Sequence, residues 1–304
     1  MQFLRMRFFG YVVFLLLPLA MSAQSQKNVL VITSTPGDYL MAAGGTLAGL
    51  IERGYIVNVV QIGNDEKNSI ALSPADTRLA NNREGEFAAK VLGVREVFIL
   101  NHKSGELGQV STNEIRNQLF GLIRHYRPQI VFHPDPWIHY EPDWDQFFSA
   151  RAAEEFSYGS GRYVGEEFTK MGLSPLGVRE TYYYAANRPY RPGEGGHNAA
   201  KFRPVDVGKT FNLKVAALEK LETANLRYAT QVKQRLDLAG KPSPLLAVLN
   251  RSTIAALIRA YAEELAETIG GKHGFKYGEE FNYHGPGESI PQHVREKAKP
   301  IGPR

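Results

Sequence analysis

The sequence predicts an α/β fold built on a Rossmann-like, doubly wound and mostly parallel sheet, and two observations carry that prediction. Short uninterrupted apolar runs recur along the chain, beginning with Asn28–Ile32, and such runs are typical of strands buried on both faces of a parallel sheet. These runs alternate with amphipathic stretches of helical length. Strands and helices that alternate at this spacing form βαβ units with right-handed crossovers.

The elements of the first half follow one another in a regular order. Apolar runs predict four strands, at Asn28–Ile32, Tyr55–Ile62, Glu96–Leu100 and Gln129–His133. Helical periodicity and capping residues predict helices between them, at Gly44–Arg53, Glu84–Leu92 and Thr112–Tyr126.

The second half of the chain differs from the first in composition. Residues 159–200 are rich in Gly, Pro, Tyr and Arg, and strand-like runs stand out at Glu180–Ala185 and Val205–Val207. We expect one long helix over Phe211–Leu236 and another over Thr253–Ile269. The last thirty residues contain several prolines and are expected to form a tail on the surface.

Composition excludes several classes of protein. The 304 residues are 43% hydrophobic and 22% charged, which is ordinary for a globular chain. Cysteine is absent, which excludes a disulfide framework, a Cys-ligated metal and a thiol nucleophile. The net charge of +5 comes with no run of Lys or Arg, so nucleic acid is not an expected partner.

The first 23 residues read as a secretory signal. Arg5 and Arg7 precede the apolar run Phe8–Leu19, and small residues end the segment at Ala23. The alternative is a membrane anchor, but this apolar run is shorter than the roughly twenty residues that cross a bilayer. We therefore expect an exported protein, periplasmic or secreted, with no stable membrane span. Its single domain is expected over residues 24–304, with a core at 28–156 and C-terminal helices and a tail at 205–304.

Two segments compete for the functional site. Ligands of open α/β sheets bind beyond the carboxyl ends of the strands, where residues 33–39 and 133–145 are expected. The second segment contains two histidines and four carboxylates, which suit metal binding or proton transfer. The alternative is a solvated acidic turn before a helix, where the helix dipole favours Asp and Glu.

Five stretches resemble the LmbE/PIG-L family of zinc-dependent N-deacetylases. They are Ser34-Thr35-Pro36-Gly37-Asp38-Tyr39, Gly44-Gly45-Thr46-Leu47-Ala48, the Ala-rich run Glu84–Val94, the strand Arg127–Phe132 and Glu141-Pro142-Asp143-Trp144. The resemblance extends from residue 28 to about residue 156. It implies an LmbE-like fold and, for the family, hydrolysis of N-acetyl groups on sugar derivatives at a zinc ion.

The reactive positions implied by the resemblance are mostly substituted. The zinc ligands fall on Thr35, Asp38 and Trp144, the general base on Gly37, and the group that polarises the carbonyl on Glu141. Catalytic zinc needs three protein ligands, and an indole has no lone pair to offer. Asp38 alone keeps a ligand's chemistry, and Gly37 cannot accept a proton. We therefore expect no cofactor.

Two hypotheses of function remain open. In the first, the protein is a non-catalytic relative that binds a glycan, another small molecule of the cell envelope or a partner, with Trp137, Tyr140 and Trp144 as candidate contacts. Tyr182–Tyr184 are weaker candidates, read mainly as strand residues. In the second, it is a re-tooled or still active metal-dependent N-deacetylase. Its metal would be held by Asp38 and a rearranged set, suited to Mg, Ca or Mn, drawn from His133, His139, Glu141 and Asp143.

Overall fold

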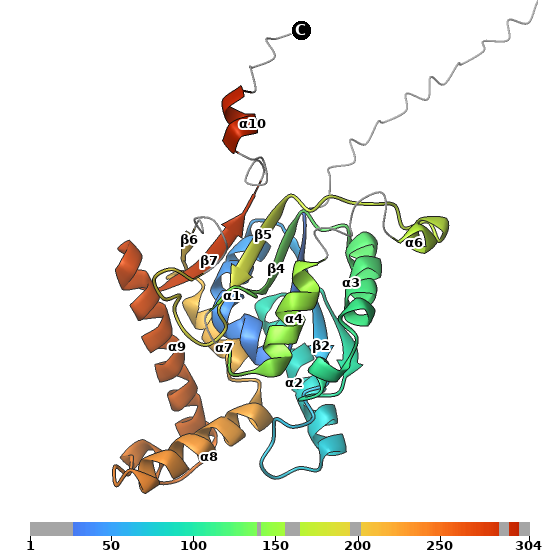
Figure 1. The fold of residues 1–304 in the computed structure, drawn as a ribbon. Helices are drawn as coiled ribbons and strands as arrows, with labels where there is room; N and C mark the ends of the chain where they lie inside the picture. The colour runs from blue at the N-terminus through green and yellow to red at the C-terminus, as the bar shows by residue number, and fades with distance from the viewer. Residues whose placement is uncertain (1–26, 139–140, 156–164, 195–201, 286–291, 298–304) are drawn as a thin grey trace, which may run out of the picture.

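The computed structural model describes residues 27–138, 141–155, 165–194, 202–285 and 292–297, and the predicted signal segment lies outside them. Seven strands form one sheet in the order β3-β2-β1-β4-β5-β7-β6 (Figure 1). The first five strands are parallel, and β7 is antiparallel to both β5 and β6. The predicted mostly parallel α/β fold is thus confirmed. The strands are β1 (Asn28–Thr33), β2 (Ile56–Gly63), β3 (Glu96–His102), β4 (Ile130–Pro134), β5 (Glu180–Tyr184), β6 (Phe202–Asp206) and β7 (Gly278–His284).

Helices cover both faces of the sheet (Figure 1). No helix in the described part of the chain is both long and apolar enough to cross a membrane. The helices are α1 (Pro36–Glu52), α2 (Pro74–Leu92), α3 (Thr112–Tyr126), α4 (Trp144–Glu154), α6 (Glu166–Lys170), α7 (Phe211–Leu218), α8 (Glu222–Leu238), α9 (Arg251–His273) and α10 (Gln292–Lys297).

The apolar run of β1 supplies both hydrophobic cores. Its side chains alternate between the two faces, because successive residues of a strand point to opposite sides. Val29 and Val31 pack in the core formed with α1, α7 and α9, whereas Leu30 and Ile32 pack in the core formed with α3 and α4. This double burial explains why the strand is apolar without interruption.

The first helix begins earlier than predicted. The sequence predicts a start at Gly44, but α1 starts at Pro36. Proline is favoured in the first turn, and Thr35 and Asp38 form a capping box across that turn. The helix therefore begins directly after β1, and its first turn carries Asp38 to the carboxyl end of the sheet.

Two predictions for later elements are wrong. The long helix predicted over Phe211–Leu236 is broken into α7 and α8, because Leu221 leaves the helical conformation at ψ 59° and Thr223 is bound by a carboxylate of α2. The acidic segment that follows β4 leads into α4, as the alternative of an acidic turn before a helix predicts. The predicted C-terminal tail contains β7, which occupies an interior position of the sheet and is held by pairing on both sides.

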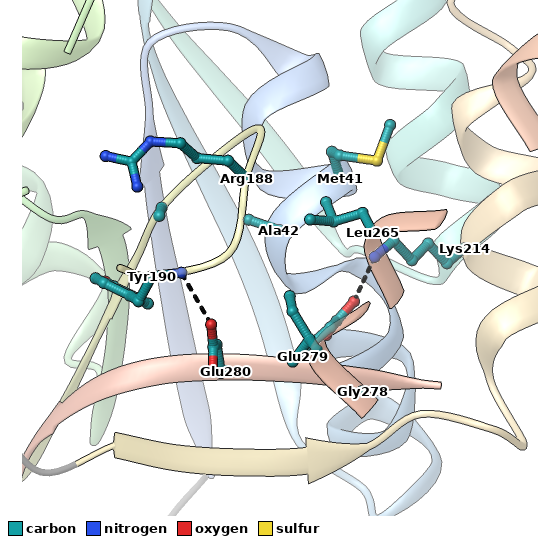
Figure 2. A pocket seen from close by; sticks show the side chains of 11 residues that line it. Met41, Ala42, Arg188, Tyr190, Lys214, Leu265, Gly278, Glu279 and Glu280 are labelled. Atoms are coloured by element: carbon teal, nitrogen blue, oxygen red, sulfur yellow. Dashed lines mark hydrogen bonds and ion pairs between the residues drawn. The ribbon is translucent and has the colours of Figure 1, made fainter. Parts of the chain in front are cut away.

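A buried carboxylate joins β7 to the middle of α1. Glu279 Oε1 accepts hydrogen bonds from Gly45 N and Lys214 Nζ at 2.9 and 2.8 Å, and its Oε2 accepts from Thr46 N at 2.8 Å and Thr46 Oγ1 at 2.6 Å. Glu279 and Lys214 are both 1% exposed. Figure 2 shows this pair beside a small internal pocket, with Arg188 and Tyr190 on the opposite side.

The two glycines of α1 make that junction possible. A Cβ atom at Gly45 would lie 2.7 Å from Val207 Cβ and 3.2 Å from the Glu279 carboxylate. A Cβ atom at Gly44 would lie 3.1 Å from Lys214 Cγ. The Gly-Gly-Thr stretch thus serves close packing, since only glycine leaves room for the C-terminal elements at this point.

We predict that Lys214→Met destabilises the fold by about 3–5 kcal/mol, because it leaves the buried charge of Glu279 without its ammonium partner. The double variant Lys214→Met/Glu279→Gln should recover part of that loss, since its Gln carbonyl still accepts from α1 and no charge remains. Urea unfolding measures both, with Lys233→Met in the exposed pair with Asp237 as the control. A loss for Lys214→Met no larger than the control's would contradict the prediction.

Candidate functional site

The two segments that compete in the sequence meet in the structure. β1 and β4 are parallel neighbours in the sheet, so their carboxyl ends lie side by side. The chain leaves β1 through α1 toward β2 on one side, whereas β4 lies on the other side. This reversal of strand order is the place where ligands bind in open α/β sheets.

Asp38 lies at the centre of this edge. Its side chain is buried at 7% exposure, and its Oδ2 accepts a hydrogen bond from Thr35 N at 3.1 Å. Burial raises the pKa of Asp38 well above its usual range, and the charge of Asp143 raises it further. The parallel pairing of β1 and β4 puts both predicted segments at the same edge of the sheet, and the electrostatic influence of Asp143 on Asp38 agrees with this.

The neighbouring position Gly37 faces open space. A Cβ atom there would meet only Leu221 Cδ1, at 3.9 Å. Room for a side chain is therefore present where the family resemblance places the general base. Thr35, at the first implied ligand position, is the residue that caps α1.

The second segment forms the start of α4. Asp143 is the N-cap, and its carboxylate accepts from Asp145 N at 2.9 Å and Gln146 N at 3.2 Å. Glu141 accepts from Asp143 N at 2.9 Å, and burial raises its pKa. The alternative interpretation of this segment, an acidic turn before a helix, thus describes its local structure.

Trp144 is 68% exposed although it is one of the largest apolar side chains. Its ring stacks on Phe148 with centroids 6.0 Å apart and planes at 25°, and it meets Phe147 edge-on at 6.3 Å. One face of the indole is therefore supported from below while most of the ring stays accessible. An aromatic ring held in this way presents a flat apolar surface next to Asp143.

The other sequence candidates have surroundings of their own or lie outside the described residues. His133 is fully buried; its Nδ1 lies 2.8 Å from Pro134 O, its ring packs edge-on against Tyr183, and burial lowers its pKa to about 4. Trp137 is 37% exposed and lies under the guanidinium of Arg151. His139 and Tyr140 lie outside the described residues. Tyr182–Tyr184 are buried residues of β5, as their strand interpretation predicts.

The structure adds Asp65, which the sequence analysis missed. This residue follows β2, is 5% exposed and has the positive φ of 54° that Asp tolerates better than most residues. Burial raises its pKa to about 7, and the charge of Asp143 contributes to the increase. Its position directly after a buried parallel strand was the signal that could have identified it.

Two tyrosines from the C-terminal helices complete the surroundings of Asp38. Tyr228 of α8 and Tyr261 of α9 stack with centroids 5.5 Å apart and planes at 20°. Burial raises the pKa of Tyr261 to about 12, with smaller increases from Tyr228, Glu264 and Asp38. The carboxylate of Glu84 holds the start of α8 by accepting from Thr223 N and Oγ1, each at 2.8 Å. Helical periodicity alone does not reveal this contact between α2 and α8.

The side chains at the implied zinc positions do not fit a zinc ion. Thr35 and Trp144 offer no imidazole or carboxylate, which leaves Asp38 as a single strong donor. Within the described ranges, no group of three His, Asp or Glu side chains converges in a way that could hold a metal. The proposed replacement set that includes His139 extends beyond those ranges and stays a prediction.

The sequence is similar to a de-N-acetylase family, to a sugar deacetylase and to a hydratase. The family model described as PIG-L, GlcNAc-PI de-N-acetylase, matches residues 30–150. The chain is 28% identical over 166 residues to the diacetylchitobiose deacetylase of Thermococcus kodakarensis, covering 54% of this chain and 61% of that enzyme's length. It is 24% identical over 211 residues to the 4-oxalmesaconate hydratase of Pseudomonas putida, covering 64% of this chain and 72% of the hydratase.

A solved structure agrees on the fold. The N,N'-diacetylchitobiose deacetylase of Pyrococcus horikoshii superimposes with a TM-score of 0.66 at 22% identity, covering 86% of this chain and 85% of that one. At this level of identity the likeness establishes the fold alone. The family match ends within α4, so the tyrosines of α8 and α9 lie beyond it.

We predict that Asp65 makes the fold less stable as the pH rises from about 4 to about 7. Burial raises the pKa of Asp65 from its ordinary value of 3.8 to about 7 in the folded protein, so the folded state binds more protons than the unfolded state across this window. Asp65→Asn removes that difference and tolerates the positive φ. The free energy of unfolding of the variant minus that of the native chain should therefore be larger at pH 8 than at pH 4.5. Urea unfolding at both pH values measures this difference. Equal differences at both pH values would refute the prediction, and Asp237→Asn on the exposed end of α8 is the control.

Proposed function

We propose that this chain, which matches the PIG-L de-N-acetylase family over residues 30–150, is an exported, sugar-binding member of that family that lacks the zinc-dependent hydrolysis. Membership suggests activity of the N-acetyl-sugar deacetylase type. The substitutions at the reactive positions argue for binding without that chemistry. The proposal of export rests on the signal-like segment 1–23. Identification of the first residue of the isolated protein tests whether this segment is removed.

The single observation that carries the proposal is the exposure of the Trp144 ring. A ligand position of the family is taken here by an indole that is 68% exposed and supported on one face by Phe148. Sugar rings stack on such faces, because their C–H groups pack against the aromatic surface while their hydroxyls stay available for hydrogen bonds. Asp38 supplies a buried acceptor on the same edge of the sheet.

The residues at the implied catalytic positions of the family do not support its hydrolytic mechanism in this chain. In the part of the chain that the structure describes, the implied zinc positions offer Asp38 as a single strong donor, so we derive no hydrolytic step. At the base position Gly37 has no side chain to take a proton. What the residues around Asp38 can do is accept hydrogen bonds from hydroxyl or amide groups of a bound ligand and shield them from water.

We predict that the protein binds oligosaccharides of N-acetylglucosamine and that Trp144→Ala weakens this binding by about tenfold, the equivalent of one good aromatic contact. Isothermal titration calorimetry with N,N'-diacetylchitobiose and longer oligomers measures the affinities. The matched control is Phe98→Ala, an aromatic residue on the edge strand β3 that is 41% exposed. Heats too small to fit for the native chain, or equal affinities for native chain and Trp144→Ala, would refute the proposal.

The second candidate function is a metal-dependent N-deacetylase with a rearranged site. The observation that favours it is that the charge of Asp143 contributes to the raised pKa of both Asp38 and Asp65, although the three carboxylates do not converge as a metal site in the described structure. A divalent cation with oxygen ligands would relieve that mutual repulsion.

Metal analysis separates the two candidates. For the sugar-binding function we expect far less than one metal ion per chain in protein purified without chelator, and no release of acetate from N-acetylglucosamine oligomers. A stoichiometric ion together with acetate release, both lost in Asp38→Ala and kept in the exposed control Asp76→Ala, would establish the second function instead.

A further inference from the structure

The connection between α8 and α9 exposes large apolar side chains. In Figure 1 it lies at the far end of these two helices, away from the sheet. Leu238 is 89% exposed, Val248 66% and Leu245 40%. Single exposed leucines are common on protein surfaces, but this connection exposes three large aliphatic side chains within eleven residues at a projecting end.

The backbone of this connection is held in place. Lys241 N donates to Leu236 O at 2.9 Å, and Leu246 N donates to Ser243 O at 3.1 Å. Leu246 is buried at 2% exposure and anchors the segment from below. At the other end Thr253 Oγ1 donates to Val248 O at 2.8 Å. The apolar side chains are therefore presented outward by an ordered segment.

The charged residues near these side chains in the sequence are mostly basic. Residues 233–251 contain Lys233, Arg235, Lys241 and Arg251 against the single acid Asp237. Two of these cations have partners, since Lys233 pairs with Asp237 at 2.9 Å and Arg251 pairs with Glu222 at 3.2 Å. Exposed leucines within a basic surrounding are the composition of segments that lie in the interface of anionic membranes.

The shape of the region favours a lipid surface over a protein partner. A stable protein interface buries about 800 Å² on each side, which a few side chains at one projecting turn do not supply. A bilayer surface, in contrast, accepts a small convex tip, because lipid headgroups move aside while the acyl boundary takes up the apolar side chains. The neighbouring Lys and Arg side chains reach the headgroups while their stems remain apolar.

We propose that the α8–α9 connection, residues 238–248, is a peripheral membrane-binding tip that places Leu238, Leu245 and Val248 in the surface of a bilayer containing anionic lipids. This role is separate from sugar binding at Asp38. It involves a surface contact at the far end of the helices that carry Tyr228 and Tyr261.

Vesicle sedimentation tests the proposal. We use the chain from residue 24 onward, which is the predicted mature form. This form binds vesicles of phosphatidylcholine with 30% phosphatidylglycerol more tightly than vesicles of phosphatidylcholine alone, and added salt weakens the binding. Leu238→Ser/Leu245→Ser/Val248→Ser lowers the affinity by about tenfold or more, and Arg235→Gln/Lys241→Gln removes the preference for the anionic vesicles.

A second readout reports insertion directly. Leu238→Trp places an indole at the most exposed position of the tip, and its fluorescence should shift to shorter wavelength when anionic vesicles are added. The control Phe98→Ser/Met171→Ser removes two exposed apolar side chains elsewhere and keeps the native affinity. Absence of vesicle binding by the native chain, or unchanged binding by the triple Ser variant, overturns the proposal. A native chain that is dimeric while the triple Ser variant is monomeric also overturns the proposal, since the tip would then be a protein interface.

Discussion

The buried contact between Glu279 and α1 determines where the candidate site lies. One carboxylate accepts hydrogen bonds from two backbone amides of α1, the hydroxyl of Thr46 and the ammonium of Lys214, all within the core. It joins β7 and α7 to the helix whose first turn carries Asp38. Because an unpaired charge in this position would be very unfavourable, the arrangement of these three elements is strongly specified. The C-terminal half is thereby fixed against the edge of the sheet where β1 and β4 end.

The inner strands β1 and β4 could be predicted from the sequence because nearly all of their residues are buried. A strand covered on both faces of a parallel sheet is mostly apolar, and such a run is visible in the sequence. β7 escaped prediction for the opposite reason. It contains Glu279 and Glu280, whose carboxylates can be buried because they pair with Lys214 and Lys272 from other parts of the chain. The break between α7 and α8 is likewise imposed by Glu84, a residue far away in sequence.

The candidate site was predictable in part. Its location at the carboxyl ends of β1 and β4 follows from the order of the strands in the sequence, whereas the assignment of the family's reactive positions to Thr35, Gly37, Asp38 and Trp144 stays a prediction from the family pattern. The exposure of Trp144 and the burial of His133 on the side of α4 depend on packing, so they needed the structure. Asp65, Tyr228 and Tyr261 come from three separate elements, and only the folded chain brings them near Asp38.

The position of β7 has a consequence for biosynthesis. This strand lies between β5 and β6 yet comes last of the seven in the chain. During translation the parallel half is complete once β5 has emerged, and its outer edge then stays open until about a hundred further residues have followed. An open strand edge invites pairing with other chains, so the nascent protein passes through an interval of vulnerability to misassembly. A chain cut short before residue 278 would remain in that condition permanently.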